Sequence, residues 1–304
     1  MPLRMILVRS RLVPTLAVLA TLALGIPTRA ADADGLDGVV IKGGEWQVAV
    51  EGLGFADGLS YDADGNVYFA DLRGDNAGVY RLSPDGTKTK LTAGGRSGTR
   101  VGADGRLYAC GGKTLVAIDV KDGKVTPVAD NLGTNDLAVS KNGHAYVTDH
   151  TKKQVTAVDL KSGAAKAADT GITAPNGIAL SPDGTILYVS DYGGSNVWAF
   201  WVNPDGSLTG KRALITMKAP ENKPTVAGGD GMTVDADGRC YVTSVLGLQV
   251  FNPSGKSLGI LPKPDSGPLV STGFGGKDLS TLYVACGDKI YKRPTKARGA
   301  APLR

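Results

Sequence analysis

Residues 175–191 read PNGIALSPDGTILYVSD: a short apolar strand, a Pro-Asp-Gly turn and a second apolar strand built around Tyr188. The Asp183-Gly184 pair is typical of a tight hairpin, because glycine accepts the positive φ that such turns require. Five further segments repeat the second strand, each with a tyrosine between apolar residues. These tyrosines are Tyr68, Tyr108, Tyr146, Tyr241 and Tyr283. The stretch is therefore one copy of a six-fold repeat.

The spacing of the repeat predicts the fold. The six tyrosines follow one another at intervals of 40, 38, 42, 53 and 42 residues. A period of about 40 residues is the length of a four-stranded propeller blade. One set of Asp-Gly or Asn-Gly turns precedes most of the tyrosine strands, and a second set of turns follows later in each repeat, which gives two hairpins per repeat. We therefore predict an all-β fold, a six-bladed β-propeller. Two stacked β-sandwiches would not explain one period running through the chain.

The ends of the repeat array predict how the ring closes. Only one more strand, at residues 289–292, follows Tyr283, so the last blade is short of an outer strand. The alternation in EWQVAV, residues 45–50, predicts an N-terminal strand that completes this blade and covers its edge. The Pro-rich segment MKAPENKPTVAG, residues 217–228, is predicted to be a loop inserted before the fifth blade. The basic residues after position 291 are expected to form a solvated tail.

The N-terminus has the pattern of a secretory signal. Arg4, Arg9 and Arg11 precede or begin an apolar run that ends near Gly25, and small residues lead up to Ala30. We predict a signal peptide at residues 1–30, a propeller domain at residues 31–304 and export to the periplasm or the extracellular space. The apolar run is shorter than the roughly 20 residues of a membrane span. An uncleaved membrane anchor is the alternative.

Charge and cysteine content narrow the function classes. Four of the 34 basic residues and none of the 29 acidic ones lie in residues 1–30, which leaves a formal charge of +1 on the rest. This balance gives no reason to expect binding to nucleic acid or, after cleavage, to a membrane. Three cysteines in apolar strands predict buried free thiols rather than a disulfide framework. We expect a monomer.

The repeat register points to a ring of polar side chains. Counting back eleven or twelve residues from each tyrosine reaches the start of the innermost strand of each blade, at one end of the central channel. The six positions all carry side-chain oxygens: Asp57, Ser97, Asn135, Asn176, Asp230 and Ser271. Carboxylate and amide oxygens are the ligands that Ca²⁺ or Mg²⁺ prefers. The alternative is that these residues cap strands or bind water in the channel.

Several segments resemble the gluconolactonase/regucalcin (senescence marker protein) family of six-bladed propeller lactonases. They are ADGLSYDADGNVYFAD (56–71), TNDLAVSKNGHAYVTD (134–149), APNGIALSPDGTILYVSD (174–191) and GGDGMTVDADGRCYVTS (228–244). The resemblance covers roughly residues 50–290. Strictosidine-synthase-like propellers carry similar repeats, so the fold is more strongly implied than the activity.

The resemblance implies one divalent cation at the channel mouth, most simply Ca²⁺, with Mg²⁺ or Zn²⁺ as alternatives. Asn176 and Asp230 match two of the family's ligands, and the register places Asp57 where the family usually has Glu. Glu51 is the alternative first ligand, six residues out of register. A carboxylate one methylene shorter than Glu still suits the flexible coordination of Ca²⁺.

The resemblance also implies residues that contact the substrate. Asn135 matches an Asn that lines the family's pocket, but Gly133 stands where the family often has Arg. Arg100 is a candidate substitute for that Arg, with a structural role as the alternative. His150 follows a strand end on the same face and is a further candidate, with an ordinary surface loop as the alternative. The missing Arg favours a substrate smaller or less polar than a sugar-acid lactone.

Together these features predict a metal-dependent hydrolase that opens a sugar-acid lactone or a related small lactone. Asp230 is the predicted general base for the attacking water, and the cation would polarise the lactone carbonyl. The G-x-S-x-G motif of a serine nucleophile is absent from the sequence. The alternative is a non-catalytic propeller that binds a carbohydrate or a protein partner at the same mouth, because one fold hosts many functions.

Overall fold

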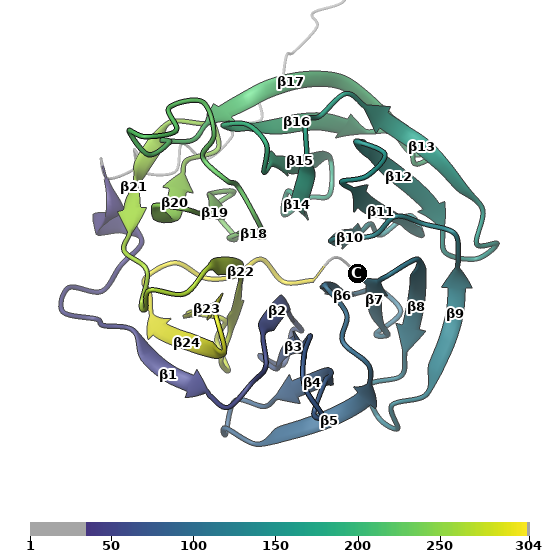
Figure 1. The fold of residues 1–304 in the computed structure, drawn as a ribbon, viewed down its shortest axis with the longest axis horizontal. Coiled ribbons are helices and arrows are strands. Elements are labelled where there is room, and N and C mark those ends of the chain that lie inside the picture. Colours follow the sequence, from purple (N-terminus) through teal and green to yellow (C-terminus); the bar gives the residue numbers. More distant parts are fainter. Residues whose placement is uncertain (1–34, 303–304) are drawn as a thin grey trace, which may run out of the picture. The chain divides into compact units, whose positions relative to one another are not determined.

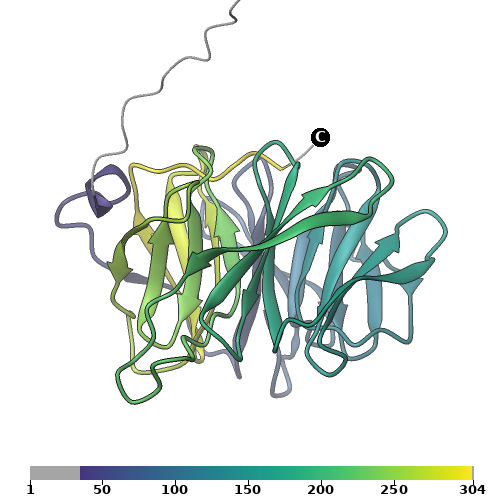
Figure 2. The ribbon, with the colours of Figure 1, turned by 90° about the horizontal axis from the view of Figure 1, so that it is seen from above.

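The computed structural model describes residues 35–302, and these form a ring of six four-stranded antiparallel sheets (Figure 1). The predicted six-bladed β-propeller is confirmed. A side view shows the strands of each blade running between the two faces of the ring (Figure 2). A single 3₁₀ turn, η1 (Leu36–Gly38), precedes the first strand. No helix within residues 35–302 has the length and apolar character needed to cross a membrane. The predicted signal peptide lies outside the described residues.

The first three blades follow the chain from the axis outward. Blade 1 contains β2 (Ala56–Tyr61), β3 (Val67–Asp71), β4 (Gly78–Leu82) and β5 (Lys88–Ala93). Blade 2 contains β6 (Gly98–Val101), β7 (Leu107–Gly111), β8 (Thr114–Ile118) and β9 (Val125–Ala129). Blade 3 contains β10 (Leu137–Val139), β11 (His144–Asp149), β12 (Gln154–Asp159) and β13 (Ala165–Thr170).

The next two blades repeat this order, and the last one differs from it. Blade 4 contains β14 (Pro175–Leu180), β15 (Ile186–Asp191), β16 (Asn196–Val202) and β17 (Leu208–Thr216). Blade 5 contains β18 (Met232–Val234), β19 (Cys240–Ser244), β20 (Gly247–Phe251) and β21 (Ser257–Leu261). Blade 6 contains β22 (Leu269–Gly275), β23 (Thr281–Cys286), β24 (Lys289–Pro294) and, outermost, β1 (Gln47–Val50).

The ring closes as the sequence predicts. Strand β1 pairs antiparallel with β24, and Gln47 lies opposite Lys292. This pairing covers the edge that the last blade would otherwise expose. The insertion between blades 4 and 5 is a loop, because the chain forms no strand between Thr216 and Met232.

The repeat tyrosines lie between the sheets and anchor the hairpins. All six are buried, and together with the apolar residues of their strands they form the clusters between neighbouring blades. The hydroxyl of Tyr68 donates to Asp62, and that of Tyr241 donates to Asp235, at 2.8 Å in both cases. These aspartates begin the Asp-x-Asp-Gly turns. Each tyrosine therefore packs its ring in the core and holds the turn of its hairpin through its hydroxyl. The three cysteines are buried and free, as predicted.

The C-terminal segment corrects one expectation. It is not a solvated tail, because Thr295 and Ala297 are buried and the segment runs across one face of the ring to its centre (Figure 1). The backbone N–H of Gly299 donates to the carbonyl of Leu279, and that of Ala236 donates to the carbonyl of Arg298. The prediction of a solvated tail was wrong because it rested on the basic side chains alone. The backbone groups and alanines between them bind to the ring.

Candidate active site

The inner strands define the two ends of the central channel. They begin near Asp57, Asn176 and Asp230, at the end we name the proximal mouth. They finish near Tyr61 and Leu180, at the end we name the distal mouth. The two mouths differ in chemistry, although the same strands form both.

A β-bulge at the start of the inner strands shapes the proximal mouth. In blade 5 the backbone N–H of Asp230 donates to the carbonyl of Thr243, and the N–H of Thr243 donates to the carbonyl of Gly231, so two residues face one. The register of β2 shifts directly after Asp57, and that of β14 shifts around Asn176. Such bulges turn side chains away from the regular pleat and are common beside active sites. The predicted ligands therefore occupy equivalent bulged positions in blades 1, 4 and 5.

Glycine at the second bulge position brings neighbouring blades into contact. A Cβ on Gly177 would lie 2.2 Å from the carbonyl oxygen of Asp230, and a Cβ on Gly231 would lie 2.6 Å from the carbonyl oxygen of Val270. No larger residue fits these positions without moving the adjacent blade. The close approach places the side chain of Asn176 within hydrogen-bonding reach of the Asp230 carboxylate.

The carboxylates at the proximal mouth repel one another. Burial raises the pKa of Asp57 well above its usual value, and the charge of Asp230 raises it further. Burial also raises the pKa of Asp230 to about 7, with a second contribution from the charge of Asp136, while the hydrogen bond from Asn176 acts in the opposite direction. Like charges held together in a site of low polarity are a common sign of a functional centre.

Asp136 is a carboxylate at this mouth that counting residues missed. Its Oδ1 accepts the backbone N–H of Leu137 at 2.7 Å, and its Oδ2 accepts the N–H of Ile178 in the next blade at 3.4 Å. Burial raises its pKa to about 6, and the positive charge of Arg100 opposes that rise. Its charge raises the pKa of both Asp57 and Asp230, so it belongs to the same electrostatic cluster.

The bulge explains why Asp136 was missed. The register count assigned one residue per blade to the ring, and it selected Asn135. In the structure Asn135 and Asp136 both face Thr148, so each is a ring position. The sequence does contain a signal for the second ring position: an adjacent Asn-Asp pair stands where other blades have Asp-Gly or Asn-Gly. The same irregularity occurs around Ser271 in blade 6, where Val270 shares the bulge.

The donor set of the proximal mouth fits a hard divalent cation. Among residues 35–302, no three His, Cys, Asp or Glu side chains are arranged to hold a metal by themselves. A cation here would therefore depend on the amide oxygen of Asn176 together with the carboxylates of Asp57 and Asp230. These are oxygen ligands of the kind that Ca²⁺ binds, and two positive charges would relieve the repulsion that raises both pKa values. Glu51 lies outside this group, as an exposed residue after β1.

Asn135 and His150 line one cleft of about 380 Å³ between blades 2 and 3. His150 is half-buried, its ring stacks on that of Tyr192 with 6.2 Å between the centroids, and its Nε2 is buried with no hydrogen-bond partner. Burial lowers the pKa of His150, which favours the neutral ring near pH 7. The structure thus brings together two of the three residues predicted to contact substrate.

Packing accounts for glycine at position 133. A Cβ there would lie 2.1 Å from Oδ2 of Asp149, a carboxylate whose side chain is 1% exposed. An arginine at this position would have to displace the carboxylate. The position where the resemblance leads one to expect an arginine is therefore packed against the carboxylate of Asp149.

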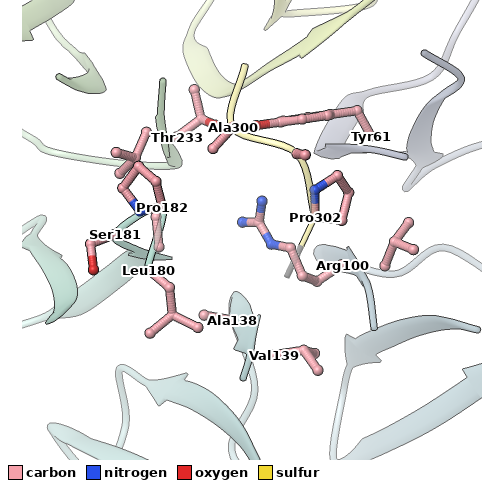
Figure 3. A pocket seen from close by; sticks show the side chains of 14 residues that line it. Tyr61, Arg100, Ala138, Val139, Leu180, Ser181, Pro182, Thr233, Ala300 and Pro302 are labelled. Atoms are coloured by element: carbon pink, nitrogen blue, oxygen red, sulfur yellow. The ribbon is translucent and has the colours of Figure 1, made fainter. Parts of the chain in front are cut away.

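Arg100, the third residue predicted to contact substrate, is directed elsewhere. It lines a cavity of about 70 Å³ at the distal mouth, together with Tyr61, Leu180 and Pro302 (Figure 3). Its Nε donates to the carbonyl of Leu137 at 3.4 Å, and its Nη2 donates to the carbonyl of Ile178 at 3.3 Å. These contacts favour the structural role over substitution for the missing Arg.

The chain is a six-bladed β-propeller with a central channel. One mouth of this channel is polar and is formed by bulged inner strands. The family model for the SMP-30/Gluconolactonase/LRE-like region matches residues 55–287. The chain belongs to this family, and the resemblance drawn from the sequence is confirmed.

Individual relatives agree with this assignment. A gluconolactonase of Zymomonas mobilis is 29% identical over 248 residues, which cover 72% of this chain and 69% of the relative. Regucalcin of Sus scrofa is 32% identical over 115 residues, or 36% of each chain. A solved gluconolactonase of Xanthomonas campestris superposes with a TM-score of 0.73 at 24% identity, over 88% of this chain and 93% of its own. A calcium-binding regucalcin of Agrobacterium tumefaciens gives a TM-score of 0.68 at 19% identity, over 84% and 96% of the two chains.

Proposed function

We propose that this protein is a lactone hydrolase that uses one divalent cation, Ca²⁺, at the proximal mouth. The observation that carries the proposal is the convergence of bulged Asp57, Asn176 and Asp230 in a family that contains gluconolactonases. The calcium-binding relative supports the choice of ion. The alternative, a non-catalytic propeller that binds a carbohydrate or a protein partner at the same mouth, is separated from this proposal by the experiment below.

The residues would divide the reaction as follows. Asp57, Asn176 and Asp230 would hold the cation, which when bound polarises the lactone carbonyl and stabilises the negative charge that develops on its oxygen. Asn135 would orient the ester by hydrogen bonding. Asp230 would accept a proton from water as the water oxygen bonds to the carbonyl carbon. The ring C–O bond then breaks, and its oxygen takes the proton back from Asp230 to give a hydroxy acid.

Proton transfer sets the pH dependence of this scheme. Asp230 must be ionised to accept a proton, and its pKa in the metal-free protein is about 7. Activity should therefore rise with pH, and binding of a cation should move the rise to lower pH because a positive charge favours the carboxylate. His150 and Asn135 remain the proposed substrate contacts, since they share the cleft next to the ring.

The test is acid release from a panel of lactones with Ca²⁺ or with a chelator. We expect hydrolysis that the chelator abolishes, and we expect Asp230→Asn to lower kcat/KM by about 10²–10⁴-fold. Asp75→Asn, at an exposed aspartate in the β3–β4 turn, is the matched control and should retain activity. A folded wild-type protein that binds Ca²⁺ but hydrolyses no lactone in the panel would favour the binding propeller.

We also propose that the protein is exported after cleavage following Ala30 and acts as a monomer. The pattern of residues 1–30 supports export, and strand β1 of the same chain completes blade 6, so closure of the ring requires no second chain. The mass of the protein recovered from the periplasm or medium, with its elution volume in size-exclusion chromatography, tests both statements.

A further inference from the structure

Six equivalent positions, each four residues after a repeat tyrosine, surround the proximal mouth. Their backbone places them there: the N–H of Tyr192 donates to the carbonyl of Ala174 at 2.9 Å, two residues before Asn176. The N–H of Val245 likewise donates to the carbonyl of Ala227 at 3.2 Å, three residues before Asp230. The six rim residues are Leu72, Gly112, His150, Tyr192, Val245 and Gly287.

Three of these residues, His150, Tyr192 and Val245, belong to the neighbouring blades 3, 4 and 5, and we name them the rim arc. The rings of His150 and Tyr192 are stacked, with an interplanar angle of 26°. The main chains at the other two positions are held near each other by Ala227, whose N–H donates to the carbonyl of Gly194 in the turn after Tyr192 and whose carbonyl accepts the N–H of Val245. The arc therefore borders the blades that supply Asn176 and Asp230.

Two side chains of the arc, those of Tyr192 and Val245, are unusually exposed to solvent. Tyr192 is 47% exposed and Val245 is 55% exposed, the largest exposed fraction of any large hydrophobic residue in the described part of the chain. Small-molecule sites are lined mainly by apolar and aromatic side chains around a few polar groups, and these two side chains lie beside such a polar group. The other exposed apolar residues lie on outer strands or loops, for example Trp201 on β16 and Val48 on β1.

We propose that this arc binds an aliphatic substituent of the lactone, so that alkyl-substituted lactones are preferred over polyhydroxylated sugar lactones. The inference rests on the proposed function and specifies its substrate class. An alkyl chain laid on Tyr192 and Val245 gains by leaving water, whereas sugar hydroxyls placed there would lose hydrogen bonds to water without replacement. Gly133 packed on Asp149 also leaves no room for an arginine at that position in the adjoining cleft wall.

The test compares three six-membered lactones that share one reacting ester: δ-valerolactone, its 5-butyl derivative δ-nonalactone, and D-glucono-1,5-lactone. We expect wild-type kcat/KM to be at least about tenfold higher for δ-nonalactone than for either other lactone. Tyr192→Ala and Val245→Ala should each reduce the ratio of the δ-nonalactone value to the δ-valerolactone value, and the double variant should remove most of the preference.

Two matched variants serve as controls. Trp201→Ala and Val48→Ala remove apolar side chains of similar exposure, 46% and 47%, that lie away from the proximal mouth. Neither should change the ratio. The inference is overturned if D-glucono-1,5-lactone is the best substrate, or if the control variants reduce the ratio as much as the arc variants do.

Binding of non-hydrolysable lactams separates this inference from the proposed function. Calorimetry on the Ca²⁺-loaded protein would compare piperidin-2-one with 6-butylpiperidin-2-one. Tighter binding of the butyl compound that is lost in Tyr192→Ala supports the arc even if no lactone is hydrolysed. Equal affinity for the two lactams overturns the arc even if lactones are hydrolysed.

Discussion

The two mouths of the propeller are built from the same six inner strands but differ in polarity and in how far they are covered. At the proximal mouth, bulges in the inner strands collect Asp57, Asp136 and Asp230, whose pKa values are all raised by burial. At the distal mouth, the C-terminal segment crosses the ring and leaves a cavity of only about 70 Å³. The repeat supplies the ring, and departures from the repeat make one mouth polar and cover the other with the C-terminal segment.

The contrast also shows where each mouth gets its stability. At the distal mouth the tail packs closely on the ring: a Cβ added to Gly299 would lie only 2.6 Å from Phe274. Main-chain hydrogen bonds along the tail add to this packing. The proximal mouth keeps like charges together at a cost in stability that a bound cation would offset.

Among changes that test the contrast between the two mouths, the largest expected effect comes from Gly177 at the proximal mouth. Gly177→Ala places a Cβ about where the Asp230 carbonyl lies, so blades 4 and 5 must separate and the cation ligands with them. We expect kcat/KM and Ca²⁺ affinity each to fall by more than about a hundredfold, because misplacement by about 1 Å costs that much. Enzyme kinetics and calcium titration measure the two losses.

Gly273→Ala is the matched control for this substitution. Gly273 lies on the inner strand of blade 6, but the nearest atom to its added Cβ is 3.6 Å away, which is ordinary contact. The control should keep near wild-type activity and affinity. If both alanine variants behave alike, close blade contact is not what assembles the site.

The second effect concerns the distal mouth. Truncation after Lys296 removes the segment that packs on Phe274 and Tyr61 and whose Pro302 lines the cavity with Arg100. We expect Tm to fall by several degrees, because buried apolar contacts and main-chain hydrogen bonds are lost. Activity with saturating Ca²⁺ should stay within about twofold of wild type below the new Tm. Loss of activity in a folded truncated protein would show that the tail acts on the site.

These regions also differ in how far the sequence could predict them. The tyrosine period and the Asp-Gly turns gave the blade number, the closing strand and the ring positions Asp57, Asn176 and Asp230, because turn chemistry and alternation are local properties. Asp136 escaped because the residue count allows one ring position per blade, whereas the bulge in blade 3 places both Asn135 and Asp136 opposite Thr148. The direction of Arg100 and the course of the tail depend on long-range packing that no local pattern records.

Asp136→Asn gives a smaller effect that tests the missed carboxylate. Removing its charge lowers the pKa of Asp230, since Asp136 is the largest charge contribution that raises it. The rise of kcat/KM with pH should then shift downward, by up to about one pH unit. Asp130→Asn, at an exposed aspartate, is the control. An unchanged profile in Asp136→Asn would remove Asp136 from the electrostatic cluster.

The smallest expected effect is a pH-dependent gain in thermal stability on adding Ca²⁺. The folded-state pKa values of Asp57 and Asp230 lie above their unfolded values, so the stability they contribute is fully present below about pH 4 and is lost as pH rises toward 7. A cation that binds the ionised pair restores that stability where it has been lost. The gain in Tm on adding Ca²⁺ should therefore be a few degrees at pH 8 and close to zero at pH 5. Scanning calorimetry at both pH values measures it, and Asp57→Asn should show little gain at either. A gain that is equal at pH 5 and pH 8 would mean that Ca²⁺ binds somewhere other than these carboxylates.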